Sequence, residues 1–373
     1  MTKSSMRDTL YDAVVVGGGV AGSAIAYTLH QKGLKICVVD RNSEIASGGS
    51  GAAGAFVSPK IGKTSSLHSL TNEAFAFAVK FYQTHFPQYF HQTGVIRIPK
   101  DDRDNQNFAL YRAFNYPNFK DIKAHTIQSL GIQSPYNGFL FEEGGVVDAK
   151  EMCEALMQGV EFKSVEIQKI EQKEGYWKLN EVIKCHFLVL ATGYHNELIN
   201  IDYMGIGGVW GCRGDFKSSL PIATSIHQDL SISQNMGGII KIGATHSHDA
   251  SHPLLPNPLE SLMQKASRLI DTTQLELVEV FCGVRSGSKD YAPLVGGVVD
   301  SAYMLQNYPQ IQKGAKAPLK SIENLFVING LGGRGFVLAP LMAHKLMQFI
   351  LEGKSIDERI DPNRLFFKWA RRL

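Results

Sequence analysis

The chain has 373 residues, of which 44% are hydrophobic and 20% charged, a composition that fits a globular protein of about two domains. The formal net charge of +3 neither demands nor excludes nucleic-acid binding, which would need a local basic patch. One such patch, or alternatively a solvated helix end, is the segment RLFFKWARRL with the cations Arg364, Lys368, Arg371 and Arg372.

Five cysteines are spread along the chain without a CxxC pair, and this spacing predicts neither a zinc site nor a disulfide framework. We therefore expect no metal site and a reduced, cytoplasmic environment. The apolar stretch 12–29 starts with Asp12 and is rich in glycine, which favours a strand, turn and helix over a signal peptide or a membrane span. The cysteines are Cys37, Cys153, Cys185, Cys212 and Cys282.

Residues 11–41 carry the pattern of one βαβ unit. Residues 12–16 form a short apolar run that indicates a buried parallel strand, and residues 20–31 are expected to form a helix. Residues 35–39 are expected to form the second strand, which ends at Asp40. The turn between the first strand and the helix has the GxGxxG spacing, which together with this context predicts a dinucleotide site.

Each glycine of this turn has a physical role. Gly17 permits the tight turn, Gly19 lets a pyrophosphate approach the backbone, and Gly22 lets the helix pack close to the strand. The helix directs its positive N-terminus at the phosphates. Asp40 lies about 20 residues further on, where an acid accepts hydrogen bonds from the ribose and disfavours NADP. The expected cofactor contacts here are Gly17, Gly19, Val20, Ala21, Gly22, Asp40 and Arg41.

Two later apolar strands also run into glycines. Residues 186–190 follow short alternating segments typical of a β-meander and lead into Ala191-Thr192-Gly193. Residues 323–329 lead into GLGGRG. Three such junctions resemble the glutathione-reductase-like FAD fold, so we expect an α/β protein with a Rossmann FAD-binding domain and a second, mainly antiparallel β-sheet domain. The expected contacts of the second junction are Ala191, Thr192 and Gly193.

The same resemblance implies a discontinuous domain organisation, because cofactor and substrate segments alternate along the chain in that fold. We expect the FAD-binding domain to take residues 1–80, 146–205 and 284–373. The substrate domain is expected to take residues 81–145 and 206–283, as an antiparallel sheet with flanking helices.

Three further segments narrow the resemblance. The small-residue run 46–60 resembles the one with which the D-amino-acid oxidase and glycine oxidase superfamily brings backbone close to the flavin, and it contributes Ser47 and Gly54 as expected contacts. Residues 282–298 resemble that superfamily's G-x-R-x-x-x-x-D-x-x-P-x-x-G pattern. The third segment is residues 330–346, where GGRG precedes APL. Taken together, the three segments resemble the FAD-dependent oxidoreductase half of the bifunctional tRNA 5-methylaminomethyl-2-thiouridine biosynthesis proteins, MnmC.

This resemblance implies a reaction, a cofactor and partners. The cofactor is FAD, expected to be non-covalent because residues 41–60 contain no His or Cys. The flavin takes a hydride from the carboxymethylaminomethyl group of a tRNA wobble uridine, which yields aminomethyl uridine and glyoxylate. The chain has no room for the methyltransferase half before its first strand, so a separate methyltransferase is an expected partner. The alternatives are a small-molecule oxidase of the glycine or sarcosine type, or a non-catalytic flavin- or RNA-binding module.

The substrate carboxylate in this reaction requires a fixed cation, and arginine suits it because its planar fork binds both oxygens. The superfamily pattern places this cation at Arg285, with Arg213 and Arg334 as the other candidates. The alternative for Arg285 is a structural ion pair with Asp290. No residue stands out as a general base.

The late loop, GLGGRGFVLAPLMAHKL, is expected to receive the flavin end of FAD. Its glycines let backbone pass beside the isoalloxazine ring, and the helix from about Val337 directs its N-terminal dipole at the flavin C2=O and N1. The alternative is a glycine-rich turn that only packs the last helix. The expected contacts are Gly332, Gly333, Arg334, Gly335 and Phe336.

Two further groups of polar residues have a structural and a functional interpretation. Lys60 and Lys63 could serve the flavin, oxygen or an RNA phosphate, but lysines on a surface turn are the favoured interpretation. The loop 245–252 is interpreted as polar rather than metal-binding, because its spacing matches no strong metal motif. Its candidate ligands are His246, His248, Asp249 and His252.

Overall fold

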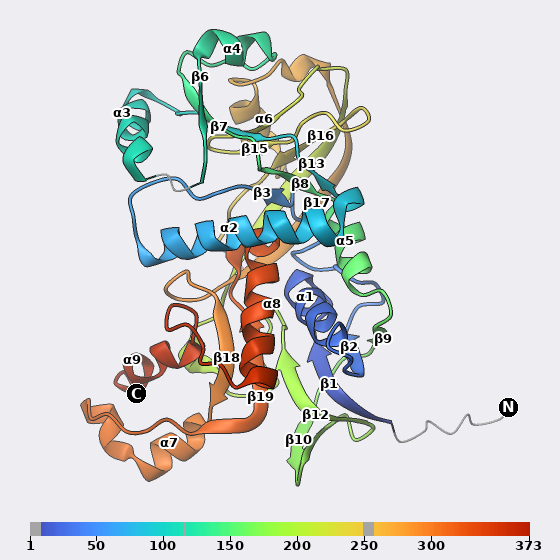
Figure 1. Ribbon diagram of the computed structural model, residues 1–373, viewed down its shortest axis with the longest axis vertical. Coiled ribbons are helices and arrows are strands. Elements are labelled where there is room, and N and C mark those ends of the chain that lie inside the picture. The colour runs from blue at the N-terminus through green and yellow to red at the C-terminus, as the bar shows by residue number, and fades with distance from the viewer. Residues whose placement is uncertain (1–8, 115–116, 249–256) are drawn as a thin grey trace, which may run out of the picture.

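Two large β-sheets dominate the computed structural model, which describes residues 9–114, 117–248 and 257–373. The first sheet occupies the lower half of the view in Figure 1 and the second sheet the upper half. The long helix α2 (Ser66–His85) lies across the molecule between them. This mixed α/β architecture, with a Rossmann-type sheet and a second sheet, confirms the expected fold class.

The first sheet is parallel at its centre, where β9, β2, β1, β12 and β19 lie in that order. β18 runs antiparallel to β19, and β10 and β11 form the predicted meander into β12. The strands are β1 (Leu10–Val16), β2 (Ile36–Asp40), β9 (Glu161–Ser164), β10 (Ile170–Lys173), β11 (Tyr176–Leu179), β12 (Ile183–Leu190), β18 (Leu294–Val299) and β19 (Ser321–Asn329).

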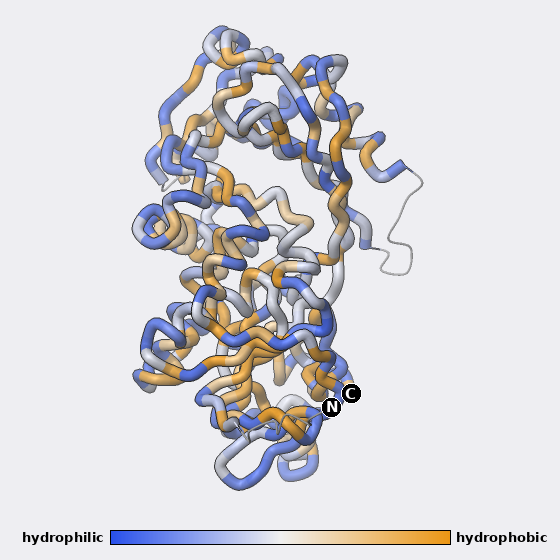
Figure 2. Tube along the Cα trace, turned by 90° about the vertical axis from the view of Figure 1, so that its right-hand side faces the viewer, coloured by the Kyte–Doolittle hydropathy of each residue, from blue (hydrophilic) through white to orange (hydrophobic). Residues whose placement is uncertain are grey.

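The central strand β1 is buried on both faces, which explains its continuous apolar sequence. Ala13 and Val15 pack into the core beneath the helices, whereas Val14 and Val16 pack into the core on the opposite face. Figure 2 shows the strands of this lower half as mainly hydrophobic. The helices over the first face are α1 (Val20–His30), α5 (Ala149–Leu156) and α8 (Gly335–Glu352), with α8 between α1 and α2.

The second sheet is antiparallel except for the parallel pair β14 and β5. Its order is β17, β13, β16, β15, β14, β5, β7 and β6. The strands are β5 (Val95–Arg97), β6 (Lys120–Ile122), β7 (Gly138–Phe141), β13 (Gly207–Ser218), β14 (Ser225–His227), β15 (Ser231–Ile232), β16 (Ile239–Gly243) and β17 (Leu275–Gly287).

A small third sheet lies near α2, where β8 pairs with β3 and with β4. These strands are β3 (Phe56–Val57), β4 (Phe90–His91) and β8 (Gly145–Val147). Shorter helices flank the sheets. They are α3 (Asp102–Tyr111), α4 (Ala124–Ser129), α6 (Glu260–Ala266), α7 (Ser301–Asn307) and α9 (Phe366–Ala370). Within the described ranges, no helix combines the length and the apolar character needed to cross a membrane.

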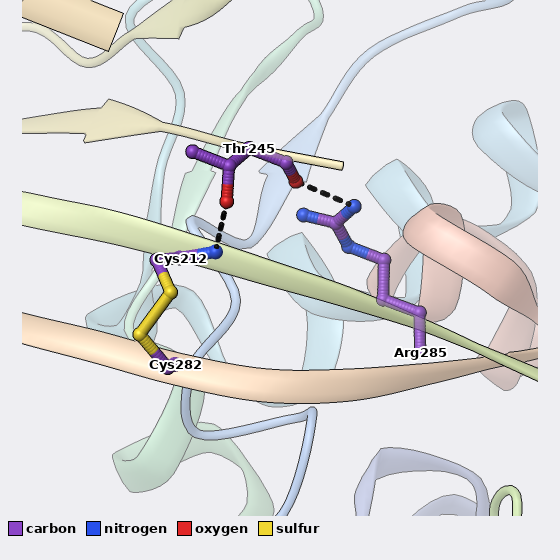
Figure 3. The surroundings of a disulfide bond; sticks show 4 residues. All are labelled: Cys212, Thr245, Cys282 and Arg285. Atoms are coloured by element: carbon purple, nitrogen blue, oxygen red, sulfur yellow. Dashed lines mark hydrogen bonds between the residues drawn. A yellow bond between two sulfur atoms is a disulfide. The ribbon is translucent and has the colours of Figure 1, made fainter. Parts of the chain in front are cut away.

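A disulfide joins Cys212 on β13 to Cys282 on β17, so the prediction of no disulfide from the cysteine spacing was wrong (Figure 3). The two cysteines are 70 positions apart in sequence, but the antiparallel register places them directly opposite each other, with their Cα atoms 4.1 Å apart. Only strand pairing reveals such a partner, since the sequence separation itself carries no signal. The other three cysteines are free and buried.

The C-terminal segment is not uniformly a basic surface. The Arg364 guanidinium forms an ion pair with Asp290, with 2.8 Å between Nε and Oδ2, and Phe366 is fully buried. Arg371 and Arg372 remain exposed. The interpretation of this segment as one solvated basic end is therefore wrong for Arg364, which anchors the segment to the loop after β17.

Candidate active site

A cavity of about 1260 Å³ opens between the two sheets. It is larger than the roughly 300–1,000 Å³ of sites for drug-sized ligands, so it has room for a dinucleotide and a substrate together. Most of the predicted site residues line this cavity. They are Gly17, Gly19, Val20, Ala21, Asp40, Arg41, Ser47, Gly54, Ala191, Thr192, Gly193, Arg285, Gly332, Gly333, Arg334, Gly335 and Phe336.

The first glycine turn is possible only without side chains at two positions. Gly17 has a φ of +114°, and a Cβ there would lie 2.3 Å from the carbonyl oxygen of Ala191. Gly22 does not line the cavity; a Cβ there would lie 1.8 Å from the carbonyl oxygen of Gly17. These contacts bring the start of α1 against the ends of β1 and β12, so the helix N-terminus faces the cavity.

Two side chains hold this turn in place. The Asp40 carboxylate accepts hydrogen bonds from the backbone N–H groups of Gly18, at 2.7 Å, and Asn42, at 2.9 Å. Ser50 Oγ accepts a hydrogen bond from the Val20 N–H at 2.9 Å, at the first turn of α1. Asp40 lines the cavity, and its predicted bond to a ribose stays a prediction. Sequence reasoning missed Ser50, because one serine in a run of small residues carries no distinct signal.

The small-residue run 46–60 lies against β17. A Cβ at Gly49 would lie 2.3 Å from the carbonyl oxygen of Val284, and a Cβ at Gly283 would lie 2.9 Å from the Cα of Gly49. Backbone therefore approaches backbone at this point, which side chains would prevent. The run connects the cofactor turn to the strand that carries Arg285.

Arg213 does not reach the cavity, so its proposed catalytic role is corrected. Its Nε lies 2.9 Å from Oδ1 of Asp215, and its Nη1 donates to the carbonyl oxygens of Gly51, at 3.0 Å, and of Ala53. The side chain is nearly fully buried. Arg213 therefore fixes the small-residue run from the second sheet, with its charge already neutralised by Asp215.

Arg285 has a different environment. Its Nη1 donates to the Thr245 carbonyl oxygen at 3.3 Å, and no described carboxylate forms an ion pair with it (Figure 3). The alternative ion pair with Asp290 is absent, since Asp290 pairs with Arg364. Gly211 leaves room for the guanidinium, because a Cβ there would lie 2.3 Å from Arg285 Nη2. Burial lowers the pKa of Arg285, and a partly buried guanidinium without a counter-charge suits an anionic ligand.

The late loop forms a 3-10 turn, η6 (Gly332–Arg334), and the helix α8 then starts at Gly335, slightly before the predicted Val337. A Cβ at Gly335 would lie 2.9 Å from a methyl carbon of Val20, so the N-termini of α8 and α1 meet at the cavity. The first turn of α8 contains no acidic residue. Both helix dipoles therefore contribute positive potential to the same cavity.

Hydrogen bonds join the late loop to its surroundings. The Tyr82 hydroxyl on α2 donates to the Phe336 carbonyl oxygen at 2.8 Å. Asn329, at the end of β19, donates from Nδ2 to the Gly193 carbonyl oxygen at 2.7 Å. The second and third glycine junctions are thus fixed to each other, which explains why both line one cavity.

Lys60 lines the cavity, so its interpretation as a surface-turn lysine was wrong, whereas Lys63 is exposed. Arg97 on β5 and His227 on β14 lie opposite each other in the second sheet and also line the cavity. Burial, followed by the charges of Arg97 and Arg334, holds the pKa of His227 well below its usual range, which keeps the ring neutral. Sequence reasoning missed Arg97 and His227, because each is a single polar residue on a short strand.

In the polar loop after β16, His246 lines the cavity. Burial, followed by the charge of Arg285, lowers the pKa of His246. His248 is exposed, and two other proposed ligands, Asp249 and His252, lie outside the described residues.

The residues present fit FAD. The first glycine turn and α1 offer free space and backbone donors for a pyrophosphate, and the late loop offers a glycine-lined passage beside a second helix N-terminus. The first glycine turn and the late loop are far apart in the sequence but line the same cavity.

Comparisons with known proteins agree with this geometry. A sequence model of the DAO family, described as "FAD dependent oxidoreductase", matches residues 12–348. Glycine oxidase from Bacillus cereus ATCC 14579 is a structural relative with a TM-score of 0.77 at 20% identity, covering 93% of this chain and 96% of that one. L-proline dehydrogenase from P. horikoshii has a TM-score of 0.78 at 17% identity, covering 95% and 97%.

Curated relatives are bifunctional tRNA 5-methylaminomethyl-2-thiouridine biosynthesis proteins, MnmC. The protein from Campylobacter concisus (strain 13826) is 27% identical over 95% of this chain and 58% of its own length. That from Legionella pneumophila (strain Corby) is 22% identical over 95% and 57%. The chain therefore spans less than two thirds of the length of these relatives. From the family match over most of its length, the chain belongs to the DAO family of FAD-dependent oxidoreductases.

Proposed function

We propose that this enzyme oxidises the CH–NH bond of an N-substituted glycine, and that this group is the carboxymethylaminomethyl group of a modified tRNA wobble uridine. Water then hydrolyses the resulting substrate imine, and the products are aminomethyl uridine and glyoxylate. The observation that carries the proposal is Arg285, a partly buried guanidinium without a carboxylate partner among the described residues, in the cavity that fits FAD. The likeness to MnmC proteins over 95% of the chain supports the tRNA substrate.

Bound FAD supplies the hydride acceptor for this reaction. Arg285 binds the substrate carboxylate through two parallel hydrogen bonds and so orients the adjacent carbon. The substrate amine must be neutral when the hydride leaves. Nearby cations, Arg285 and Arg334, disfavour an ammonium group in this cavity and so lower the pKa of a bound amine. The substrate can therefore lose its proton to solvent without a dedicated base.

The N-terminus of α8 has a second electrostatic role. Its free N–H groups, at Gly335 and just after it, face the end of the cavity where the N-terminus of α1 also lies. Negative charge that develops at this end during oxidation is stabilised by the helix dipole without reorganisation of the protein. The side chains of the first turn are apolar and leave this potential unscreened.

The alternative function is oxidation of a free small amine or amino acid, of the glycine or sarcosine type. The fold shared with glycine oxidase from Bacillus cereus over 93% of the chain favours it. The same Arg285 would then bind the carboxylate of the free amino acid. In both functions the oxidised group lies in the same cavity. The functions differ in whether this group belongs to a tRNA or to a free small molecule.

The test is nucleoside analysis by mass spectrometry after the FAD-loaded enzyme is incubated with tRNA that carries the carboxymethylaminomethyl group. We expect conversion to the aminomethyl nucleoside with release of glyoxylate. Arg285→Ala should lower the rate at least about a hundredfold, because a bidentate charged contact to the reacting group is lost. Arg268→Ala, at an exposed position, is the matched control and should convert tRNA at the normal rate.

Unchanged tRNA, combined with peroxide formation from free N-substituted glycines, would establish the alternative instead. Full activity of Arg285→Ala would refute the assigned role of this residue. In the tRNA pathway, a methyltransferase would act next on the aminomethyl product, and we place both steps in the cytoplasm.

A further inference from the structure

Three cations gather around one short segment of the cavity wall, residues 58–60. Arg334, from the late loop, donates from Nη1 to the Ser58 carbonyl oxygen at 3.4 Å. Arg97, from β5, donates from Nη2 to the next carbonyl oxygen, that of Pro59, at 2.8 Å. The third cation is the side chain of Lys60 itself, and all three line the cavity. Three distant parts of the chain thus bring positive charge to one place.

No described carboxylate forms an ion pair with Lys60, Arg97 or Arg334, and the Nε of Arg97 is buried without a hydrogen-bond partner. Burial lowers the pKa of each of the three, and the neighbouring charges that act on Lys60 and Arg97 are those of the other cations. By contrast, the buried Arg213 is neutralised by Asp215. Partly buried cations without a counter-charge are unfavourable, so this cluster suits an anion.

The backbone that carries this cluster is held in place by neighbouring side chains. Asn72 on α2 accepts a hydrogen bond from the Lys60 N–H at 2.8 Å and donates to the Lys60 carbonyl oxygen at 3.0 Å. His227 forms a hydrogen bond between its Nε2 and Ser58 Oγ at 3.0 Å, while its Nδ1 contacts the Ser231 hydroxyl. Segment 58–60 is therefore fixed from α2 and from the second sheet. Such preorganisation reduces the entropic cost of binding.

This cluster is separate from Arg285 but close to it along the late loop. Arg285 reaches the cavity from β17 and donates to the Thr245 carbonyl oxygen, whereas Arg97 and Arg334 donate to residues 58 and 59. A Cβ at Gly333 would lie 3.6 Å from the Arg285 Cδ, and the next residue is Arg334, which turns to Ser58. The cavity wall therefore has two positive positions, Arg285 and the cluster of three cations, with the late loop between them.

We propose that Lys60, Arg97 and Arg334 form a second anion subsite, which binds an acidic group of the substrate other than the carboxylate held by Arg285. The ligand class of this enzyme is then a dianion. The inference rests on the proposed function for the role of Arg285. The second acidic group is a phosphate of the nucleotide that bears the oxidised group, or the second carboxylate of a small dicarboxylate.

The test uses ligands that cannot be oxidised and measures their binding to the FAD-loaded enzyme by the change in flavin absorbance. Glutarate and valerate have the same chain length and differ in one carboxylate. We expect glutarate to bind at least about tenfold more tightly, because it gains charged hydrogen bonds at the second subsite. Uridine 5′-monophosphate compared with uridine tests the phosphate source in the same way.

Two variants locate the subsite. Lys60→Gln and Arg97→Gln should each weaken glutarate at least about tenfold and leave valerate within about twofold. Lys63→Gln, an exposed neighbour, is the matched control and should change neither. The charge-conserving variants Lys60→Arg and Arg97→Lys should retain the preference for the dianion, which separates a binding role from a folding defect.

Equal affinities for glutarate and valerate, with no preference for uridine 5′-monophosphate over uridine, would overturn the proposal. It would also be overturned if the two Gln variants weakened valerate as much as glutarate. Because the titration requires no turnover, its outcome is independent of the tRNA assay. A preference for dianions in an enzyme that leaves tRNA unchanged would refute the proposed substrate and keep the second subsite.

Discussion

Gly211 shows how a missing side chain positions a functional group. It lies on β13 opposite Gly283, and the space that a Cβ would fill is occupied by the Arg285 guanidinium. A methyl group there would displace the guanidinium and would also lie 2.8 Å from the Thr245 carbonyl oxygen, to which Arg285 donates. The orientation of Arg285 thus depends on a residue that has no side chain of its own.

We predict that Gly211→Ala folds and retains FAD but raises KM for carboxylate substrates about tenfold, because the guanidinium moves away from its binding position. Steady-state kinetics with flavin absorbance as a check of FAD content measures this effect. Gly207→Ala is the matched control on the same strand, since a Cβ there meets no atom within 4 Å. An unchanged KM in Gly211→Ala would contradict the positioning role.

Arg213 shows what the sequence could reveal at this scale. Arg213 and Asp215 stand two positions apart on one strand, so they lie on the same face and can pair. That spacing can be read from the sequence. It distinguishes Arg213, which has a structural role, from Arg285, the proposed ligand of the substrate carboxylate. The Lys60, Arg97 and Arg334 cluster had no such signal, because tertiary contacts with the carbonyls of residues 58 and 59 create it.

At the scale of elements, an ion-pair network ties α2 to α8. Asp357 pairs with Arg359, and Arg359 also pairs with Glu73 on α2, at 2.8 Å between Nη2 and Oε2. Lys345 on α8 lies 3.6 Å from Asp357 and 3.2 Å from Glu73. Hydrogen bonding to Arg359 lowers the pKa of Asp357 to about 2 from its usual 3.8. Ion pairs as well as packing therefore connect α2 to α8, the helix that follows the late loop.

This network gives stability a defined pH dependence. Asp357 is ionised more readily in the folded protein than in the unfolded chain, so its contribution is complete above about pH 4 and is lost as the pH falls towards 2. We predict that Asp357→Asn lowers the free energy of unfolding by about 2 kcal/mol at pH 7 and by about half as much at pH 3. Urea unfolding at both pH values measures this. An equal loss at pH 7 and pH 3 would show that the effect is not electrostatic.

The sequence predicted the elements that follow a regular pattern. The first βαβ unit, the meander into β12 and the three strand-to-glycine junctions are all present, because buried parallel strands and glycine turns leave local signatures. The start of α8 at Gly335 was placed slightly late, since a 3-10 turn precedes it and carries the same residue types. The disulfide was missed, because it depends on the register of β13 with β17.

At the scale of the whole molecule, the disulfide closes a long section of the second sheet. Cys212 and Cys282 enclose β14, β15, β16 and α6, so their bond restricts the unfolded chain between them. The section that it closes carries His227 and His246 of the cavity wall. The second sheet therefore holds its part of the site by a covalent link as well as by hydrogen bonds.

We predict that the denatured, unreduced protein has three reactive thiols and that reduction exposes all five. Thiol titration in denaturant measures both numbers. The double variant Cys212→Ala, Cys282→Ala should lose about 2–4 kcal/mol of unfolding free energy, and reduction should then leave its stability unchanged. Five reactive thiols before reduction would contradict the disulfide.

The pairing of β12 with both β1 and β19 has a consequence for synthesis of the protein on the ribosome. β1 and α1 are made long before β19, so the central sheet gains β19 only after position 329 has been made. Until then, the apolar edge of β12 is open to wrong partners. The nascent chain therefore carries an incomplete nucleotide fold while the residues between β12 and β19 are made, and the late loop follows directly after the strand that closes this edge.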